Sequence, residues 1–374
     1  MTVDSLFLFL VATLVPGSLI SCSVCFLMRH WAPRWRLLDQ PGERKVHTRA
    51  VPLGGGIGIW LGAVGTFALG SLTLLATGNG TPAAPWIPEF ARPHLAGLRE
   101  QLSALWVLLG GATVLVVIGL IDDVRGLSWR IRIAAQFVVA AMCVYGQGWH
   151  LTAFVELPIV TGALSVLWIV MLVNSFNMLD NMDGLSGGVA AIACSILAAF
   201  LLLSPDPESH GPQLFVAGFL LVLVGALLGF LWHNRSPARI FMGDAGSYFV
   251  GFCIAIATMQ ATYAGYSSGT RHAILAPVCV LAVPLYELAS VLWIRLRESQ
   301  SPFVRDTNHF SHRLVELGMT QQQAVLTIYL ATLTCGLGAL LLNRVDMFGA
   351  LLVVVIVACE LALIAVLEIA ASRK

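Results

Sequence analysis

The sequence predicts an all-α membrane protein whose chain crosses the bilayer about eleven times. Of its 374 residues, 58% are hydrophobic and 11% are charged, whereas a soluble domain has about 45–50% apolar and about 25% charged residues. The apolar residues form blocks of about 20, the length that a helix needs to cross ~30 Å of hydrocarbon. Fibrous, disordered and disulfide-stabilised classes are excluded, and the net charge of +1 gives no reason to expect a nucleic-acid partner.

Eleven apolar segments, separated by polar, Gly-rich or Pro-rich residues, account for this count. In order they are about 6–28, 53–76, 104–121, 131–147, 157–174, 185–203, 213–232, 246–263, 272–294, 323–342 and 347–369. The first segment has no basic region before it, so we interpret it as a retained helix and not as a signal peptide. No soluble domain interrupts the series. Residues 1–374 are therefore expected to form a single transmembrane domain.

The basic residues predict the orientation. With eleven helices the connecting segments alternate between the two sides, and all but four of the 21 Lys and Arg residues then fall on one side. The four exceptions are Arg92, Arg99, Arg271 and Arg344. Because cytoplasmic segments are rich in Lys and Arg, we expect the N-terminus outside and the C-terminus in the cytoplasm.

Carboxylates gather on the same side as the basic residues. The Asp residues on this side include Asp122, Asp123, Asp180, Asp183, Asp244 and Asp306. Carboxylates crowded at one membrane face repel one another unless a cation lies between them. Mg²⁺ is the obvious candidate, because it prefers carboxylate and amide oxygens and usually binds together with a substrate phosphate.

Two acidic clusters follow the third and fifth predicted helices. Asp122 and Asp123 are candidates for a metal ligand or a general base, with Arg130 and Arg132 for phosphate contacts; the alternative is a solvated helix end. In the second cluster, oxygen-bearing side chains recur at intervals of three residues. On a helix or tight helical loop they form one inclined row that we expect to face a wet cavity: Asn174, Asn177, Asp180 and Asp183.

A third cluster precedes the eighth predicted helix. Asp244 has glycines nearby at the helix start, where free backbone N–H groups suit phosphate and metal together; a plain N-cap is the alternative. Asn234 and Phe241 come just before it. Phe241 is a candidate for stacking on a planar base, although a single aromatic in a membrane loop is more often packing.

Two further clusters are basic or rich in histidine. His309 and His312 share a helical face, with Arg313 adjacent, and predict a polar, cationic site for phosphate; interfacial packing is the alternative. Lys45 is one of only two lysines and lies in a basic run. Because this run lies on the same side as three acidic loops, we expect Lys45 to help bind an anion. The alternative is an ordinary basic loop on the cytoplasmic side.

These five clusters, in this order, resemble the polyprenyl-phosphate N-acetylhexosamine-1-phosphate transferases of glycosyltransferase family 4, over about residues 39–325. Asp122 and Asp123 look like the family's aspartate pair. The stretch 177–184 resembles its N-x-x-D-x-x-D-G motif, and 234–244 resembles its N-x₉-D motif. The segment 309–313 is similar to the family's H-x-H-H-R loop, with Ser311 in place of the inner histidine.

The resemblance implies a reaction. A sugar-1-phosphate would pass from a UDP-sugar to undecaprenyl phosphate at the cytoplasmic face of a bacterial inner membrane, with release of UMP, as the first membrane step of a cell-envelope glycan such as lipopolysaccharide or teichoic acid. GlcNAc is the default sugar, because 239–247 and 309–314 resemble the WecA/TagO branch more than the muramoyl-pentapeptide branch.

The resemblance also implies residue roles. Asp244 with Asn177 would bind Mg²⁺ or Mn²⁺, Asp183 and Phe241 would face the uracil, and the catalytic carboxylates would be Asp122, Asp123 and Asp180. The remaining expected substrate contacts are Lys45, Arg132, Asn174, Asn234, His309, His312 and Arg313.

Other functional classes fit the sequence less well. A transporter would carry its charged residues near the bilayer midplane between inverted repeats, whereas here they gather at one face. A membrane phosphotransferase for CDP-alcohols would contain D-G-x-x-A-R followed by G-x-x-x-D-x-x-x-D, and this string is absent. The same reaction with another UDP-N-acetylhexosamine stays open, as do the glycan pathway and a homodimer.

Overall fold

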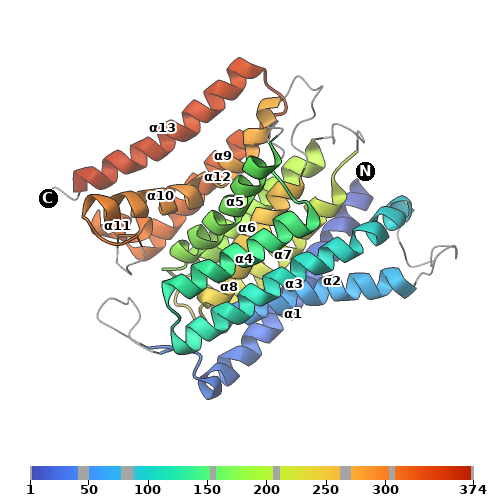
Figure 1. Ribbon diagram of the computed structural model, residues 1–374, viewed down its shortest axis with the longest axis horizontal. Helices are drawn as coiled ribbons and strands as arrows, with labels where there is room; N and C mark the ends of the chain where they lie inside the picture. Colours follow the sequence, from blue (N-terminus) through green and yellow to red (C-terminus); the bar gives the residue numbers. More distant parts are fainter. Residues whose placement is uncertain are drawn as a thin grey trace.

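The computed structural model describes residues 2–40, 50–76, 87, 89–151, 157–204, 211–261, 271–302 and 308–371, and most of these are helical (Figure 1). The α-helices are α1 (Val3–Trp31), α2 (Gly55–Ala76), α3 (Leu95–Arg125), α4 (Trp129–Gln147), α5 (Pro158–Leu179), α6 (Leu185–Leu203), α7 (Leu214–Asn234), α8 (Gly243–Gln260), α9 (Ala276–Val280), α10 (Ala282–Arg297), α11 (Phe310–Glu316), α12 (Gln321–Leu340) and α13 (Met347–Ala371). Three short 3-10 helices are η1 (Ala32–Trp35), η2 (Glu89–His94) and η3 (Arg271–Leu275). Strands β1 (Leu38–Asp39) and β2 (Val51–Pro52) pair in antiparallel orientation.

Each of the eleven predicted segments contains helix. By length and apolar composition, eight helices of the described chain are candidates to cross a membrane, or nine if the bent pair α9–α10 counts as one span. Helices α4 and α8 are not among them. The protein is thus an all-α, multi-pass membrane protein, and the count of eleven crossings stays a prediction.

The prediction of one continuous helix over 272–294 was wrong. The segment formed by η3 and α9 meets α10 at an angle of 64°. Pro284 contributes to the break, because it has no N–H to donate to the carbonyl of Val280 and its ring disfavours a continuous helix there. Helix α10, which carries Glu287, therefore runs in a different direction from α9.

Helix α8 lies inside the bundle, and every residue from 245 to 258 is buried. It packs against α3 and α5 at glycines. A Cβ at Gly119 of α3 would lie 2.4 Å from the Ala245 nitrogen, and a Cβ at Gly251 would lie 2.7 Å from the Leu172 carbonyl oxygen of α5. These close approaches bring the ends of α3 and α5 to the start of α8.

Apart from Trp106, which is exposed within α3, the exposed tryptophans of the described chain lie at one end of the bundle, where α1, α7 and α10 end and α4 begins. They are Trp31, Trp35, Trp129, Trp232 and Trp293. Tryptophan is enriched where a membrane meets water, so this end of the bundle lies at an interface. The segments that join α3 to α4, α5 to α6 and α7 to α8 lie at the same end.

Candidate active site

The end of α3 meets the start of α8 through Asp123. Its carboxylate accepts hydrogen bonds from the backbone nitrogens of Asp244 (3.0 Å) and Ala245 (3.4 Å). A carboxylate at this position satisfies helix N–H groups that have no partner within the helix and complements the helix dipole. Gly243 has φ +72°, and a Cβ there would lie 2.6 Å from Asp123 Oδ2, so the contact depends on glycine. Asp123 therefore fixes the position of Asp244.

Asp122 is directed to α4. Its Oδ2 lies 3.0 Å from Arg132 Nη1, and its Oδ1 accepts the backbone N–H of Leu127. The same Nη1 lies 3.7 Å from Asp244 Oδ2. Arg132 thus contacts both Asp122 and Asp244, while Asp123 has a different set of partners. The two adjacent carboxylates therefore have different hydrogen-bond partners.

Helix α5 contributes two asparagines with separate contacts. The amide nitrogen of Asn177 lies 2.6 Å from Asp244 Oδ1 and 3.0 Å from Ser247 Oγ. One turn earlier, Asn174 donates to Gln136 Oε1 of α4 at 2.6 Å. Asn177 therefore belongs to the cluster around Asp244, and Asn174 links α5 to α4.

The other two members of the predicted row, Asp180 and Asp183, follow the end of α5. Burial, together with the nearby charge of Asp123, raises the pKa of Asp180 to about 7. Asp183 Oδ2 accepts the backbone N–H of Ala238 at 2.9 Å, which joins the α5–α6 turn to the α7–α8 segment. Because α5 ends at Leu179, Asp180 and Asp183 lie beyond the helix, and Asn174, Asn177 and Asp183 have different hydrogen-bond partners.

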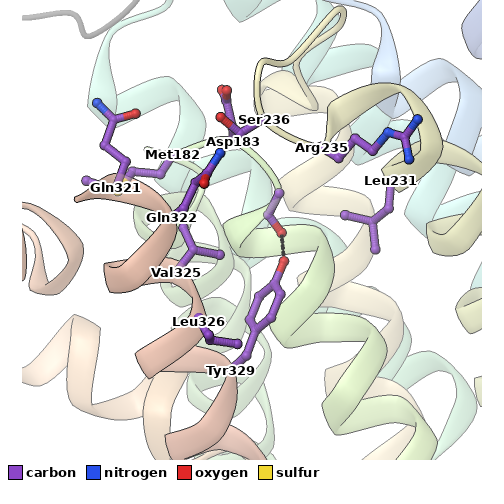
Figure 2. A pocket seen from close by; sticks show the side chains of 11 residues that line it. Met182, Asp183, Leu231, Arg235, Ser236, Gln321, Gln322, Val325, Leu326 and Tyr329 are labelled. Atoms are coloured by element: carbon purple, nitrogen blue, oxygen red, sulfur yellow. Dashed lines mark hydrogen bonds between the residues drawn. The ribbon is translucent and has the colours of Figure 1, made fainter. Parts of the chain in front are cut away.

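A cavity of about 370 Å³ opens beside Asp183 (Figure 2). It lies between the α5–α6 turn, the segment after α7 and the first turns of α12. Its polar lining consists of Asp183, Arg235, Ser236, Gln321, Gln322 and Tyr329, and the Tyr329 hydroxyl donates to the Gly184 carbonyl at 2.5 Å. Carboxylate, amide and guanidinium groups around a hollow suit a ligand that both donates and accepts hydrogen bonds. The sequence reasoning did not identify Arg235 or the glutamines.

Asn234 and Phe241 hold segments together. The buried Asn234 accepts from the Gly184 nitrogen at 2.9 Å and donates to the Ile240 carbonyl at 2.8 Å. The backbone of Phe241 bonds to Pro52 and Gly55. Its side chain is half-buried and is not part of the cavity lining beside Asp183.

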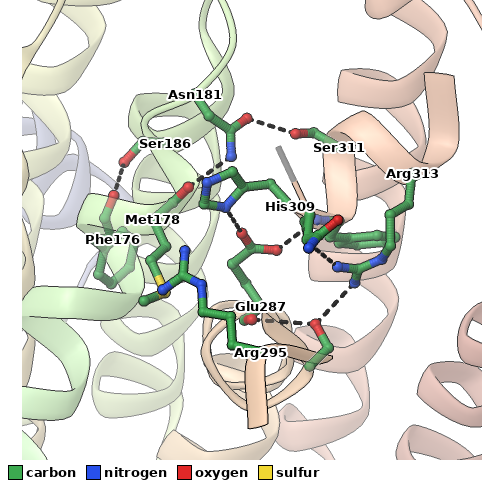
Figure 3. A network of polar contacts seen from close by, with 12 residues as sticks. Phe176, Met178, Asn181, Ser186, Glu287, Arg295, His309, Ser311 and Arg313 are labelled. Carbon is green, nitrogen blue, oxygen red and sulfur yellow. Dashed lines mark hydrogen bonds and ion pairs between the residues drawn. The ribbon is translucent and has the colours of Figure 1, made fainter. Parts of the chain in front are cut away.

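The histidine segment reaches the α5–α6 turn (Figure 3). Ser311, at the position of the family's inner histidine, donates to Asn181 Oδ1 at 2.5 Å. Arg313 lies 2.9 Å from Ser290 Oγ and 3.1 Å from Glu368 Oε2. Burial, with His309 nearby, lowers the pKa of His312. The predicted cationic character of this site therefore does not come from His312 near neutral pH.

Two buried acids in this region were missed by the sequence reasoning. Glu287 of α10 is 0% exposed and contacts His309, and Glu368 of α13 is 9% exposed and contacts Arg313 and Tyr286. The available signal was an acid inside an apolar segment, which a membrane protein retains only with a partner. Lys45 and Asp306 lie outside the described residues.

The residues around Asp244 fit a magnesium ion that arrives with its substrate. Within the described ranges no group of three or more His, Cys, Asp or Glu side chains is arranged to hold a metal ion. Mg²⁺, however, is usually held by one or two carboxylates, with substrate phosphates and water completing its coordination. Asp244 and the side-chain oxygen of Asn177 are hard ligands of this kind.

The fold and the site define a class: a multi-pass membrane protein with Asp, Asn and Arg side chains from four helices gathered at the interface end of its bundle. The model of glycosyl transferase family 4 matches residues 105–262. This range includes Asp122, Asp123, Asn177 and Asp244.

Comparisons that cover most of the chain agree with that match. The chain is 30% identical over 336 residues to the probable undecaprenyl-phosphate N-acetylglucosaminyl 1-phosphate transferase of Bacillus subtilis, covering 88% of this chain and 83% of the relative. It is 32% identical over 326 residues to the decaprenyl-phosphate N-acetylglucosaminephosphotransferase of Mycobacterium tuberculosis (81% and 75%). It is 28% identical over 320 residues to the undecaprenyl-phosphate alpha-N-acetylglucosaminyl 1-phosphate transferase of Escherichia coli (82% and 76%). The chain belongs to glycosyl transferase family 4.

Proposed function

We propose that this protein transfers GlcNAc-1-phosphate from UDP-GlcNAc to undecaprenyl phosphate and releases UMP. The names and coverage of its relatives support this activity. The observation that carries the proposal is the convergence of Asn177, Asp244, Arg132 and Asp122 from four helices at one end of an apolar bundle. A lipid phosphate and a soluble nucleotide can meet only at such an interface.

The chemistry explains why this set of side chains is needed. An oxygen of the lipid phosphate attacks the phosphorus that carries the sugar, the bond between the two phosphates of UDP-GlcNAc breaks, and UMP leaves with the bonding electrons. Several negative phosphates come together, so the main tasks are charge neutralisation and in-line alignment. Mg²⁺ (or Mn²⁺), when bound by Asp244 and Asn177, would supply positive charge to the phosphate oxygens.

The protein's own groups divide the remaining work. Arg132, which already contacts Asp122 and Asp244, neutralises phosphate charge, and Asp123 holds Asp244 in position. We assign the uracil to the cavity beside Asp183, where glutamine and arginine side chains can pair with its donor and acceptor edge. Lys45 and Arg313 are assigned to phosphate oxygens.

We further propose that the site faces the cytoplasm of a bacterial inner membrane. The asymmetry of the basic residues supports this orientation. UDP-sugars are soluble nucleotides, so the donor would reach the interface end of the bundle from the cytoplasm.

A donor panel tests the activity. Membranes that contain the protein are incubated with undecaprenyl phosphate, Mg²⁺ and, in separate reactions, UDP-GlcNAc, UDP-GalNAc or UDP-MurNAc-pentapeptide, and UMP is measured. The proposal predicts the fastest UMP release with UDP-GlcNAc, dependent on added lipid phosphate. UMP release that is independent of the lipid, or fastest with another donor, would contradict the proposed reaction or the proposed sugar respectively.

A further inference from the structure

Glu287 is a buried acid in α10 with two partners at the start of α11. Its side chain is 0% exposed. One carboxylate oxygen lies 2.6 Å from His309 Nδ1, and the other accepts the backbone N–H of Phe310 at 2.9 Å. A buried carboxylate in an apolar helix is costly unless it is paired and hydrogen-bonded, and these two contacts use both of its oxygens.

The chemistry of the two partners determines where the ring proton of His309 lies. A carboxylate only accepts hydrogen bonds, so His309 Nδ1 has to be the donor. The Phe310 N–H is a donor in any case. The imidazole therefore carries its proton on Nδ1, and Nε2 is the nitrogen that remains for a ligand.

The position of His309 places it next to the proposed active site. Ser311, two residues later, donates to Asn181, which follows Asp180 in the α5–α6 turn. Figure 3 shows this contact together with the Glu287–His309 pair. The His309 side chain is 14% exposed, so a ligand can reach it. Among the described residues, no hydrogen bond to its Nε2 is found.

We propose that Glu287 is a positioning residue of the transfer reaction: through its contact with His309 Nδ1 it fixes the ring and proton of that histidine so that Nε2 faces the substrate phosphates. The inference rests on the proposed function. It assigns to α10 a role that the resemblance to the family did not suggest. A purely structural role, in which Glu287 only anchors the backbone of α11 through Phe310, is the competing explanation.

A double-mutant cycle separates the two explanations. The values of kcat and KM are measured for Glu287→Gln, His309→Asn and the double variant, with UDP-GlcNAc and undecaprenyl phosphate in detergent. Glutamine matches the shape of glutamate, but one of its two terminal atoms is a donor NH₂ instead of an acceptor oxygen. It therefore cannot accept hydrogen bonds from both His309 and Phe310 in the way that Glu287 does. Glu298→Gln is the matched control, since this acid follows the same helix and is exposed.

Glu287→Gln should lower kcat about 10–100-fold, the scale of the loss when the hydrogen-bond partner of a metal-bound histidine is removed. KM for UDP-GlcNAc should change less than about threefold, because the effect passes through His309 at the phosphates. When His309 is already replaced by Asn, adding Glu287→Gln should lower kcat by less than about a further threefold. The reason is that the effects of residues that act through one another are not additive. Glu287→Asp, which keeps two acceptor oxygens, should recover part of the lost kcat, and Glu298→Gln should behave as wild type.

Independent, multiplying effects of the two substitutions would overturn the proposal, and so would a Glu287→Gln variant that is more active than Glu287→Asp. If Glu287→Gln does not fold, as judged by its melting temperature in detergent, the cycle is repeated with Glu287→Asp, and additive effects there overturn the proposal equally. An inactive wild-type protein would refute the proposed function and this inference with it. An active wild type with an unimpaired Glu287→Gln variant would refute the inference alone.

Discussion

The amide nitrogen of Asn177 lies 2.6 Å from Asp244 Oδ1, although the two residues are 67 positions apart in the chain. The contact joins the end of α5 to the start of α8. Asp244 also faces Arg132 of α4, and its backbone nitrogen is held by Asp123 of α3. Through its backbone and its side chain, Asp244 thus contacts residues of three other helices, which makes it a sensitive position for a test of the proposed metal site.

Asp244→Asn should lower turnover at least ~10²-fold, the scale of losing one catalytic electrostatic contact. The substitution keeps the size of the side chain but removes the charge that would bind Mg²⁺. The measurement is UMP release at saturating Mg²⁺. Asp4→Asn, at the exposed start of α1, is the control and should keep normal activity. Near-normal turnover of Asp244→Asn would exclude it as a metal ligand.

Asp183→Ala should act mainly on the binding of the nucleotide. A contact to the uracil is present in both the ground state and the transition state, so its loss raises KM for UDP-GlcNAc, by about tenfold or more, with little change in kcat. Initial rates over a range of UDP-GlcNAc concentrations give both constants. Since Asp183 also accepts the Ala238 N–H, the melting temperature has to be compared with wild type. A loss confined to kcat would argue against the uracil assignment.

Asp122→Asn and Asp123→Asn should show the opposite pattern. Asp122 balances Arg132, and Asp123 holds the start of α8, so both act where charge changes as the new bond forms. Their kcat should fall, while UDP-GlcNAc binding, measured by calorimetry, stays within about a factor of ten. Loss of nucleotide binding in Asp122→Asn, with Asp183→Ala impaired only in kcat, would show that the two clusters have exchanged roles.

Much of the helical framework followed from the sequence, because apolar blocks of the right length leave few alternatives in a membrane. The break near Leu281 did not, even though Pro284 is visible in the sequence. Proline is tolerated within many membrane helices when neighbours compensate, so its presence alone does not decide between a kink and a continuous span. The 64° bend depends on how α9 and α10 pack against the rest of the bundle.

The candidate site was predictable as a set of residue types but not as a set of contacts. The motifs located Asp122, Asp123 and Asp244, yet the sequence could not show that Asp123 caps α8 while Asp122 pairs with Arg132. Glu287 lay in a predicted membrane span, and its partner His309 is 22 positions further along the chain. Such pairings depend on which helices become neighbours, and local pattern carries no information on that.

The proposed orientation is testable with a pair of introduced cysteines. Ser311 is a poor site for this, because it is 1% exposed and bonded to Asn181. Gln300→Cys, exposed after α10, should be shielded from an impermeant thiol reagent in intact cells and labelled after lysis. Arg344→Cys, exposed between α12 and α13, should be labelled in intact cells. The unmodified protein, with its eight cysteines, gives the background labelling. Labelling of Gln300→Cys in intact cells, with Arg344→Cys labelled only after lysis, would overturn the topology.

The fate of the sugar-linked phosphate tests the central claim most directly. Purified protein is incubated with undecaprenyl phosphate, Mg²⁺ and UDP-GlcNAc that carries a radiolabel on the phosphorus attached to the sugar, and lipid and nucleotide products are separated. Transfer of a sugar-1-phosphate predicts that the label enters the lipid, with one unlabelled UMP released per lipid formed. Label that stays with released UDP, while an unlabelled glycolipid forms, would mean that the sugar moves without its phosphate and would contradict the account.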